Sequence, residues 1–392
     1  MALLLICAVL FGVSLSAAAG FESKLNEPQG GVLAVAHRGE TTAHVPNTSD
    51  AVLAAADAGA DLISVALTKT ADNAFVLLAD GQKALVNETQ TLLQMQTALY
   101  GGFSAQKVTE LTDVCEALSG RAGLIADFET EDLDALCAYL RENGLTELVL
   151  PRVFLPQKEI VRFAQANPDI RLLGVYRGNV VMNANAFLKE LSEAGLPLVQ
   201  YQNKNYFCVS FQVFTTGRFS VGGNGRAMVN MTQPDLCGRR EDSITGWDDM
   251  ISRGFSAVET GDISGLCAYL ARSEEMLPGL RSALDAAQAQ PLDSLSAQSV
   301  KALEAAIAAG EAALESNAAL SVRQSALSAL QNAVSFAVPA GENETRKGAL
   351  QITTGKVLTV LFFAVLVFAV QVYMHKKQDQ KGEDHHAKKK HH

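Results

Sequence analysis

The chain is short of positive charge and of cysteine, and each shortage excludes a class of protein. Its 392 residues hold 32 Lys and Arg against 42 Asp and Glu, which gives a formal net charge of −10. A nucleic-acid-binding face needs a basic surplus to neutralise phosphates, so this balance argues against DNA or RNA as a partner. The six cysteines follow no zinc-ligand spacing, and an odd number of them remains after Cys7, so no disulfide framework is required.

Two long apolar runs lie near the ends of the chain. The first, with small residues after it, predicts a secretory signal peptide over residues 1–20, and a weak membrane anchor is the alternative. Residues 352–374 are apolar and long enough to cross a bilayer as one helix. The basic tail, 375–392, is then expected in the cytoplasm. These runs predict a single-pass protein of the cell membrane with its bulk outside the cytoplasm.

Between residues 31 and 272, short apolar runs alternate with helical patterns. Strand, helix and strand at this spacing are typical of parallel βαβ units. About eight strands in this length predict an α/β fold of the TIM-type (β/α)8 barrel class, and a doubly wound open sheet is the structural alternative. We expect strands at Gly31–Val35, Leu62–Leu67, Phe75–Leu78, Leu124–Phe128, Leu145–Leu150, Ile170–Tyr176, Leu198–Tyr201, Ala227–Met231 and Ser256–Glu259.

Residues 274–338 differ in composition from the preceding part of the chain. Ala, Leu, Ser, Gln and Glu dominate, and apolar residues recur with a helical period. Pro291 separates the first helix from the second, so we expect a small all-α unit of three helices. This unit resembles the FIVAR modules of bacterial surface proteins, which implies a bacterial host and a stalk or binding role. Residues 339–351 are predicted to be a linker.

The chemistry-bearing motif follows the first predicted strand. An apolar run at 31–35 delivers His37 and Arg38 to the edge of a sheet. Together with Pro46-Asn47-Thr48 and the stretch Thr70–Asp80, this motif resembles the glycerophosphodiester phosphodiesterase family without gaps. The resemblance covers residues 31–272, is looser at its end, and implies a TIM barrel with its site at the carboxyl ends of the strands.

The resemblance implies roles for individual residues. His37 matches the family's first catalytic histidine and Arg38 its phosphate-binding arginine. The family also implies a second histidine, a divalent cation, usually Mg or Ca, and acidic side chains that hold it. At those positions this sequence has Ala79 for the second histidine, Pro46, Ser64 and Ala66 for the acids, and Asp127 as a possible remaining ligand. Glu129 stands where the family has a lysine.

Alanine cannot carry a proton, and one remaining carboxylate is a poor site for a divalent cation. The sequence therefore predicts a catalytically degenerate barrel, a pseudoenzyme without a cofactor that retains His37 and Arg38 for a phosphate-bearing small molecule or a surface protein. An active phosphodiesterase of lipid metabolism that recruits Glu40, His44 or Glu129 is the first alternative. A structural scaffold is the second. In a purely structural reading, Asp127 pairs with a base such as Arg152.

Overall fold

The computed structural model describes residues 21–27, 30–79, 82, 86, 88–100, 108–176, 190–191, 193–202, 226–233, 240–315 and 317–340. The predicted signal peptide, membrane span and tail lie outside these residues, as does nearly all of the predicted linker. Within the described part of the chain, no helix is both long and apolar enough to cross a membrane. The chain divides into two compact units, Met1–Gln290 with Lys301–Phe336, and Pro291–Val300 with Ala337–His392.

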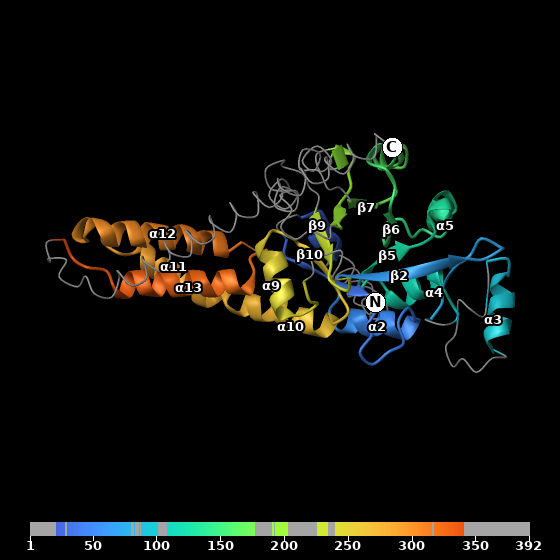
Figure 1. Cartoon of the computed structure of the whole chain (residues 1–392), viewed down its shortest axis with the longest axis horizontal. Helices are drawn as coiled ribbons and strands as arrows, with labels where there is room; N and C mark the ends of the chain where they lie inside the picture. Colours follow the sequence, from blue (N-terminus) through green and yellow to red (C-terminus); the bar gives the residue numbers. More distant parts are fainter. Residues whose placement is uncertain are drawn as a thin grey trace, which may run out of the picture. The chain divides into compact units, whose positions relative to one another are not determined.

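The first unit contains a closed parallel barrel (Figure 1). Each parallel strand pairs with the next parallel strand along the chain, and β1 pairs with both β2 and β10, which closes the ring. The predicted barrel is therefore confirmed, and the open sheet is excluded. Its parallel strands are β1 (Leu33–His37), β2 (Leu62–Lys69), β5 (Gly123–Asp127), β6 (Val149–Val153), β7 (Leu173–Tyr176), β8 (Leu198–Tyr201), β9 (Arg226–Asn230) and β10 (Ala257–Thr260).

Helices cover the outside of the ring, and an antiparallel extension leaves it after β2. In that extension β3 (Phe75–Leu77) pairs with both β2 and β4 (Thr109–Glu110). Thr48 caps the first of the covering helices, α2, because its hydroxyl accepts from the Ala51 N–H. The described helices up to residue 275 are α2 (Ser49–Asp57), α3 (Leu92–Tyr100), α4 (Leu111–Leu118), η2 (Thr130–Asp132), α5 (Leu133–Glu142), α6 (Gln157–Ala166), α9 (Ile244–Ser252) and α10 (Ile263–Glu275).

The three helices expected after residue 274 are α11 (Leu277–Gln288), α12 (Ala297–Ala313) and α13 (Leu320–Ser335), with a short η4 (Leu292–Ser294) after Pro291. Gly310 lets α12 approach its neighbours, since a Cβ there would lie 2.8 Å from Leu330 and 3.3 Å from Leu284. Within the first unit, hydrogen bonds connect α13 to α9 and α10. The Ser321 N–H donates to Asp248 (3.0 Å), and the Leu320 N–H donates to the Tyr269 hydroxyl (3.1 Å).

One strand prediction is wrong by several residues. The sequence predicts Leu145–Leu150, but β6 is Val149–Val153. Leu145 still belongs to the turn after α5, because its N–H donates to the Leu140 carbonyl (2.8 Å). Pro151 lowers the strand propensity of the true segment, since proline cannot donate a ladder hydrogen bond. With these bounds, β6 carries Arg152.

Layers of side chains fill the barrel interior. The strand register, with the stagger of an eight-stranded parallel barrel, puts four inward side chains from alternate strands in each layer. The two lower layers are apolar: Leu62, Leu150, Leu198 and Ala257, then Val35, Ile125, Leu173 and Met228. Phe21 and Leu25 close the floor below them. The two layers at the carboxyl end are mostly polar: Ser64, Arg152, Gln200 and Glu259, then His37, Asp127, Val175 and Asn230.

Candidate functional site

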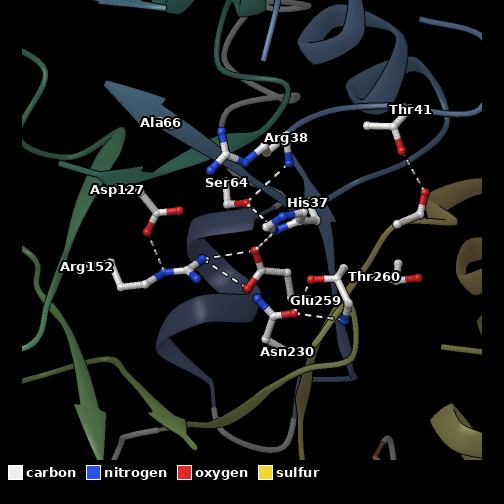
Figure 2. A network of polar contacts seen from close by, with 12 residues as sticks. His37, Arg38, Thr41, Ser64, Ala66, Asp127, Arg152, Asn230, Glu259 and Thr260 are labelled. Carbon is white, nitrogen blue, oxygen red and sulfur yellow. Dashed lines mark hydrogen bonds and ion pairs between the residues drawn. The ribbon is translucent and has the colours of Figure 1, made fainter. Parts of the chain in front are cut away.

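The mostly polar layers stand where barrel enzymes carry their sites, at the carboxyl ends of the strands. His37 ends β1, and its Nδ1 lies 2.8 Å from Oε1 of Glu259 on β10 (Figure 2). The Ser64 hydroxyl lies 3.4 Å from the same nitrogen. An ionised carboxylate can only accept, so Nδ1 of His37 carries the proton and Nε2 keeps its lone pair in the neutral ring.

Arg152 bonds to one carboxylate and forms an ion pair with another. Its Nη2 donates to both oxygens of Glu259, at 3.0 and 3.1 Å. On the other side its Nε lies 3.1 Å from Oδ1 of Asp127. Figure 2 shows the guanidinium between the two acids. Arg152 and Glu259 have 4% and 0% of their side-chain surface exposed, so this is a buried network in which each charge depends on the others.

The network sets the protonation of its two acids in opposite directions. Burial by itself would raise the pKa of Glu259, but the charge of Arg152 and the bond from His37 outweigh it and lower that pKa to about 2. Burial raises the pKa of Asp127; the Arg152 charge opposes this rise, and the Glu259 charge adds to it. Glu259 is therefore the permanent anion, and Asp127 is the group more ready to take a proton.

Arg38 has a different environment from Arg152. Its backbone adopts φ 57°, a left-handed conformation that few non-glycine residues take. Its N–H donates to the Ser64 carbonyl (2.9 Å) and hydroxyl (3.3 Å), which holds the residue in place. Gly39 follows at φ 94°, and a Cβ there would lie 2.6 Å from the Ala51 carbonyl carbon. Among the described residues, the Arg38 guanidinium has no hydrogen-bond or ion-pair partner.

Two further residues of the predicted motif, Asn47 and Ala79, make structural contacts in this chain. Asn47, fully buried, donates to the Ala66 and Leu78 carbonyls (2.8 and 2.9 Å) and accepts from the Ala66 N–H (2.7 Å). Asn47 therefore links β2 to the segment after β3 by hydrogen bonds. Ala79 is buried, and its N–H donates to Oε1 of Gln82 (2.7 Å).

The residues present do not fit a divalent cation of the Mg or Ca type. Such a cation takes six or more oxygen ligands, several of them carboxylates. Asp127 and Glu259 are both engaged by Arg152, and Ser64 and Ala66 stand where the family has acids. Across the part of the chain that the structure describes, no three His, Cys, Asp or Glu side chains gather as a metal site would need.

The side chains that an active enzyme was expected to recruit, Glu40, His44 and Glu129, do not take part in this network. Glu40 accepts from the N–H groups of Thr42 and Ala43 (3.0 and 3.1 Å) and from His44 (2.9 Å). Its bonds to the Thr42 hydroxyl and to His44 lower its pKa to about 2. These contacts hold Glu40 within its own loop, and Glu129 is exposed. The predicted pairing of Asp127 with Arg152 is confirmed.

Sequence reasoning gave no site role to Arg152, Glu259, Gln200 or Asn230. Arg152 lies beyond the end of the strand predicted at Leu145–Leu150, although an arginine inside the apolar run Val149–Phe154 was a usable signal. Glu259 is the one charge in its strand. Barrel closure brings it beside His37, from which it is separated by 222 positions in sequence. Local patterns cannot show such a contact.

Comparisons with known proteins bear on the fold. No family model and no curated protein matches the sequence. Among solved structures, a glycerophosphodiester phosphodiesterase from Agrobacterium tumefaciens is similar, with 15% identity, 60% of this chain and 99% of that chain covered, and a TM-score of 0.45. A glycerophosphoryl diester phosphodiesterase from Parabacteroides distasonis has 14% identity, coverages of 61% and 85%, and a TM-score of 0.47.

A phosphodiesterase from Oleispira antarctica, in complex with the product sn-glycerol-3-phosphate, has 12% identity, coverages of 61% and 96%, and a TM-score of 0.46. The predicted resemblance to structures of this family is confirmed as a likeness of the barrel. At these identities the likeness concerns fold alone, so we take the chemistry of the site from its own contacts.

Replacing Glu259 tests the buried network through stability and pH. Its folded-state pKa of about 2 lies below the ordinary value of 4.5, so the stability it supplies is complete above about pH 4.5 and is lost as the pH falls through about 2. We expect Glu259→Gln to lower the free energy of unfolding at pH 7 by about 3 kcal/mol, because Arg152 loses its main counter-charge. Urea unfolding at several pH values measures this.

Glu129→Gln, at an exposed position, is the matched control and should change the unfolding free energy by less than about 0.5 kcal/mol. The difference in unfolding free energy between Glu259→Gln and the native chain should become smaller below pH 4. Equal stability of the two at pH 7 would contradict the described network.

Proposed function

We propose that the barrel binds a phosphate-bearing small molecule at its carboxyl end and does not perform metal-dependent hydrolysis. One observation carries this proposal: Arg152, with its two carboxylates, fills the centre of the site, while the Arg38 guanidinium beside it has no partner among the described residues. The first feature disfavours a divalent cation. The second leaves guanidinium N–H donors for an anion.

Charge balance supports an anionic ligand. Arg152 faces two carboxylates, Glu259 and Asp127, so it holds the site together rather than attracting ligand. Once Asp127 takes a proton, Glu259 alone matches Arg152, and the charge of Arg38 is left for an anion. Arg38 adds a guanidinium whose planar donors suit two phosphate oxygens at once. Asp127, with its pKa raised, can take a proton and then donate to a phosphate oxygen. His37 offers Nε2, since Nδ1 is bonded to Glu259.

Replacing Arg38 tests this binding. We expect Arg38→Gly to weaken binding of glycerol 3-phosphate at least tenfold, because a charge-assisted hydrogen bond contributes about 1.5–3 kcal/mol. Glycine suits the φ of 57°, so thermal stability should be maintained. Isothermal titration of the full chain measures the affinity. Arg121→Gly is the control, since Arg121 bonds Asp57 on the surface. Unchanged affinity in Arg38→Gly would overturn the proposal.

A second candidate is an active phosphodiesterase with a rearranged site, and the His37–Glu259 pair favours it. A carboxylate that fixes the tautomer of a histidine leaves the other ring nitrogen able to accept a proton, as general-base catalysis requires. Among the described residues, no second histidine stands beside His37, since Ala79 occupies that family position. This lack of a second histidine is why we place the enzyme second.

The two functions differ in a direct assay. We expect the full chain to release no glycerol 3-phosphate from glycerophosphocholine, with added Mg²⁺ or Ca²⁺ or with a chelator. Release that persists with chelator and is lost in His37→Ala would establish the second candidate. Release that requires the added metal would contradict our assessment of the metal site. Release of glycerol 3-phosphate, detected by a coupled glycerol-3-phosphate dehydrogenase, measures all three outcomes.

We also propose that the protein is anchored in a cell membrane, with a signal at 1–20, a span at 352–374, a cytoplasmic tail at 375–392 and the barrel outside the cytoplasm. Residues 274–338 then act as a stalk or as a contact for a surface protein. The sequence supports this arrangement. Alkaline extraction of membranes tests it: the full chain should stay with the membrane, and a chain lacking 352–374 should not.

A further inference from the structure

Gln200 is a buried polar residue that has no part in the network or in the phosphate binding described above. It lies on β8 between Val199 and Tyr201, which pack outward against the helices. Leu198, two residues earlier, belongs to the barrel interior. Because strand side chains alternate, Gln200 also faces the interior, in the layer it shares with Ser64 and Arg152. It is fully buried.

Within the described part of the chain, the amide of Gln200 has no hydrogen-bond partner at either end. Neither Nε2 nor Oε1 bonds to a described residue, although both atoms are buried. Its polar neighbours in the layer are engaged: Arg152 donates to Glu259, and Ser64 accepts from Arg38. A primary amide offers two donors and an acceptor with two lone pairs. Burying all of them unpaired costs free energy, which native proteins seldom accept without a functional reason.

The position of Gln200 limits where a partner comes from. The layer below it is apolar, with Leu173 on β7 and Met228 on β9, and offers no hydrogen bond. Above it, on the neighbouring strands, stand Val175 and Asn230. The Asn230 Oδ1 already accepts from the N–H and hydroxyl of Thr232 (2.9 and 2.7 Å). A partner for Gln200 therefore enters from the carboxyl end, the end where Arg38 lies.

We propose that Gln200 binds a hydroxyl group on the alcohol portion of a phosphate ester, the phosphate of which lies at Arg38. The ligand class is thus a phosphate ester of a polyol. A hydroxyl both donates and accepts, so it matches an amide that presents a donor and an acceptor side by side. Because Gln200 has no exposed surface, the hydroxyl reaches it only after the groups above it shift. This inference rests on the proposed function and adds the part of the ligand that gives specificity.

Two ligands and one substitution test the assignment. Glycerol 3-phosphate and propyl phosphate differ by two hydroxyl groups, and both carry the phosphate that Arg38 would hold. We expect the native full chain to prefer glycerol 3-phosphate at least tenfold in isothermal titration. Gln200→Leu should remove that preference, leave the affinity for propyl phosphate unchanged, and raise the melting temperature, because an unpaired buried amide is replaced by an apolar side chain.

Gln165→Leu, at an exposed position of α6, is the matched control and should change neither preference nor melting temperature. Gln200→Met repeats the substitution with a flexible side chain, in case leucine does not pack. The assignment is overturned if Gln200→Leu and Gln200→Met keep the preference for glycerol 3-phosphate, or if they lower the affinity for both ligands equally. Two other results would instead overturn the proposed phosphate site. In one, the native chain binds neither ligand; in the other, Arg38→Gly binds both ligands with the native affinity.

Discussion

The site depends on the contact of Arg152 with Glu259. A guanidinium and a carboxylate without exposure are stable only together, because removing either leaves an uncompensated charge in a medium that solvates it poorly. Their two hydrogen bonds link β6 to β10 across the barrel. Glu259 then fixes the His37 ring through Nδ1, and Arg152 reaches on to Asp127. Four strands thus meet in one buried network.

In the proposed function, this network accounts for His37 and Arg38 without the acids that the sequence resemblance implies. A divalent cation would bring two positive charges to the centre of the barrel and need several free carboxylates. Arg152 brings one positive charge that is permanent and covalently attached, and it uses the two carboxylates present. Arg38 adds a second guanidinium at this end of the barrel, without a hydrogen-bond or ion-pair partner among the described residues. We propose on this basis that the site binds an anion rather than a divalent cation.

The sequence predicted the barrel because alternating strands and helices are local patterns, and parallel strands at that spacing have few ways to pack. It also predicted His37 and Arg38, because they follow a strand directly. It missed the role of Arg152 for two reasons. Pro151 obscured the true strand β6, and the partner Glu259 lies 107 positions away. Gln200 stands in an ordinary strand pattern, and its significance comes from the lack of a partner, which only packing reveals.

We propose that the fixed guanidinium of Arg152 takes the place of a metal ion in this site. Titration calorimetry of the full chain with Mg²⁺ and with Ca²⁺ at pH 7 tests it most directly. We expect no saturable heat from either ion at concentrations up to about 1 mM, the range of weak binding. Binding of one ion per chain with a Kd below that concentration, lost in Asp127→Asn or Glu259→Gln, would contradict the claim.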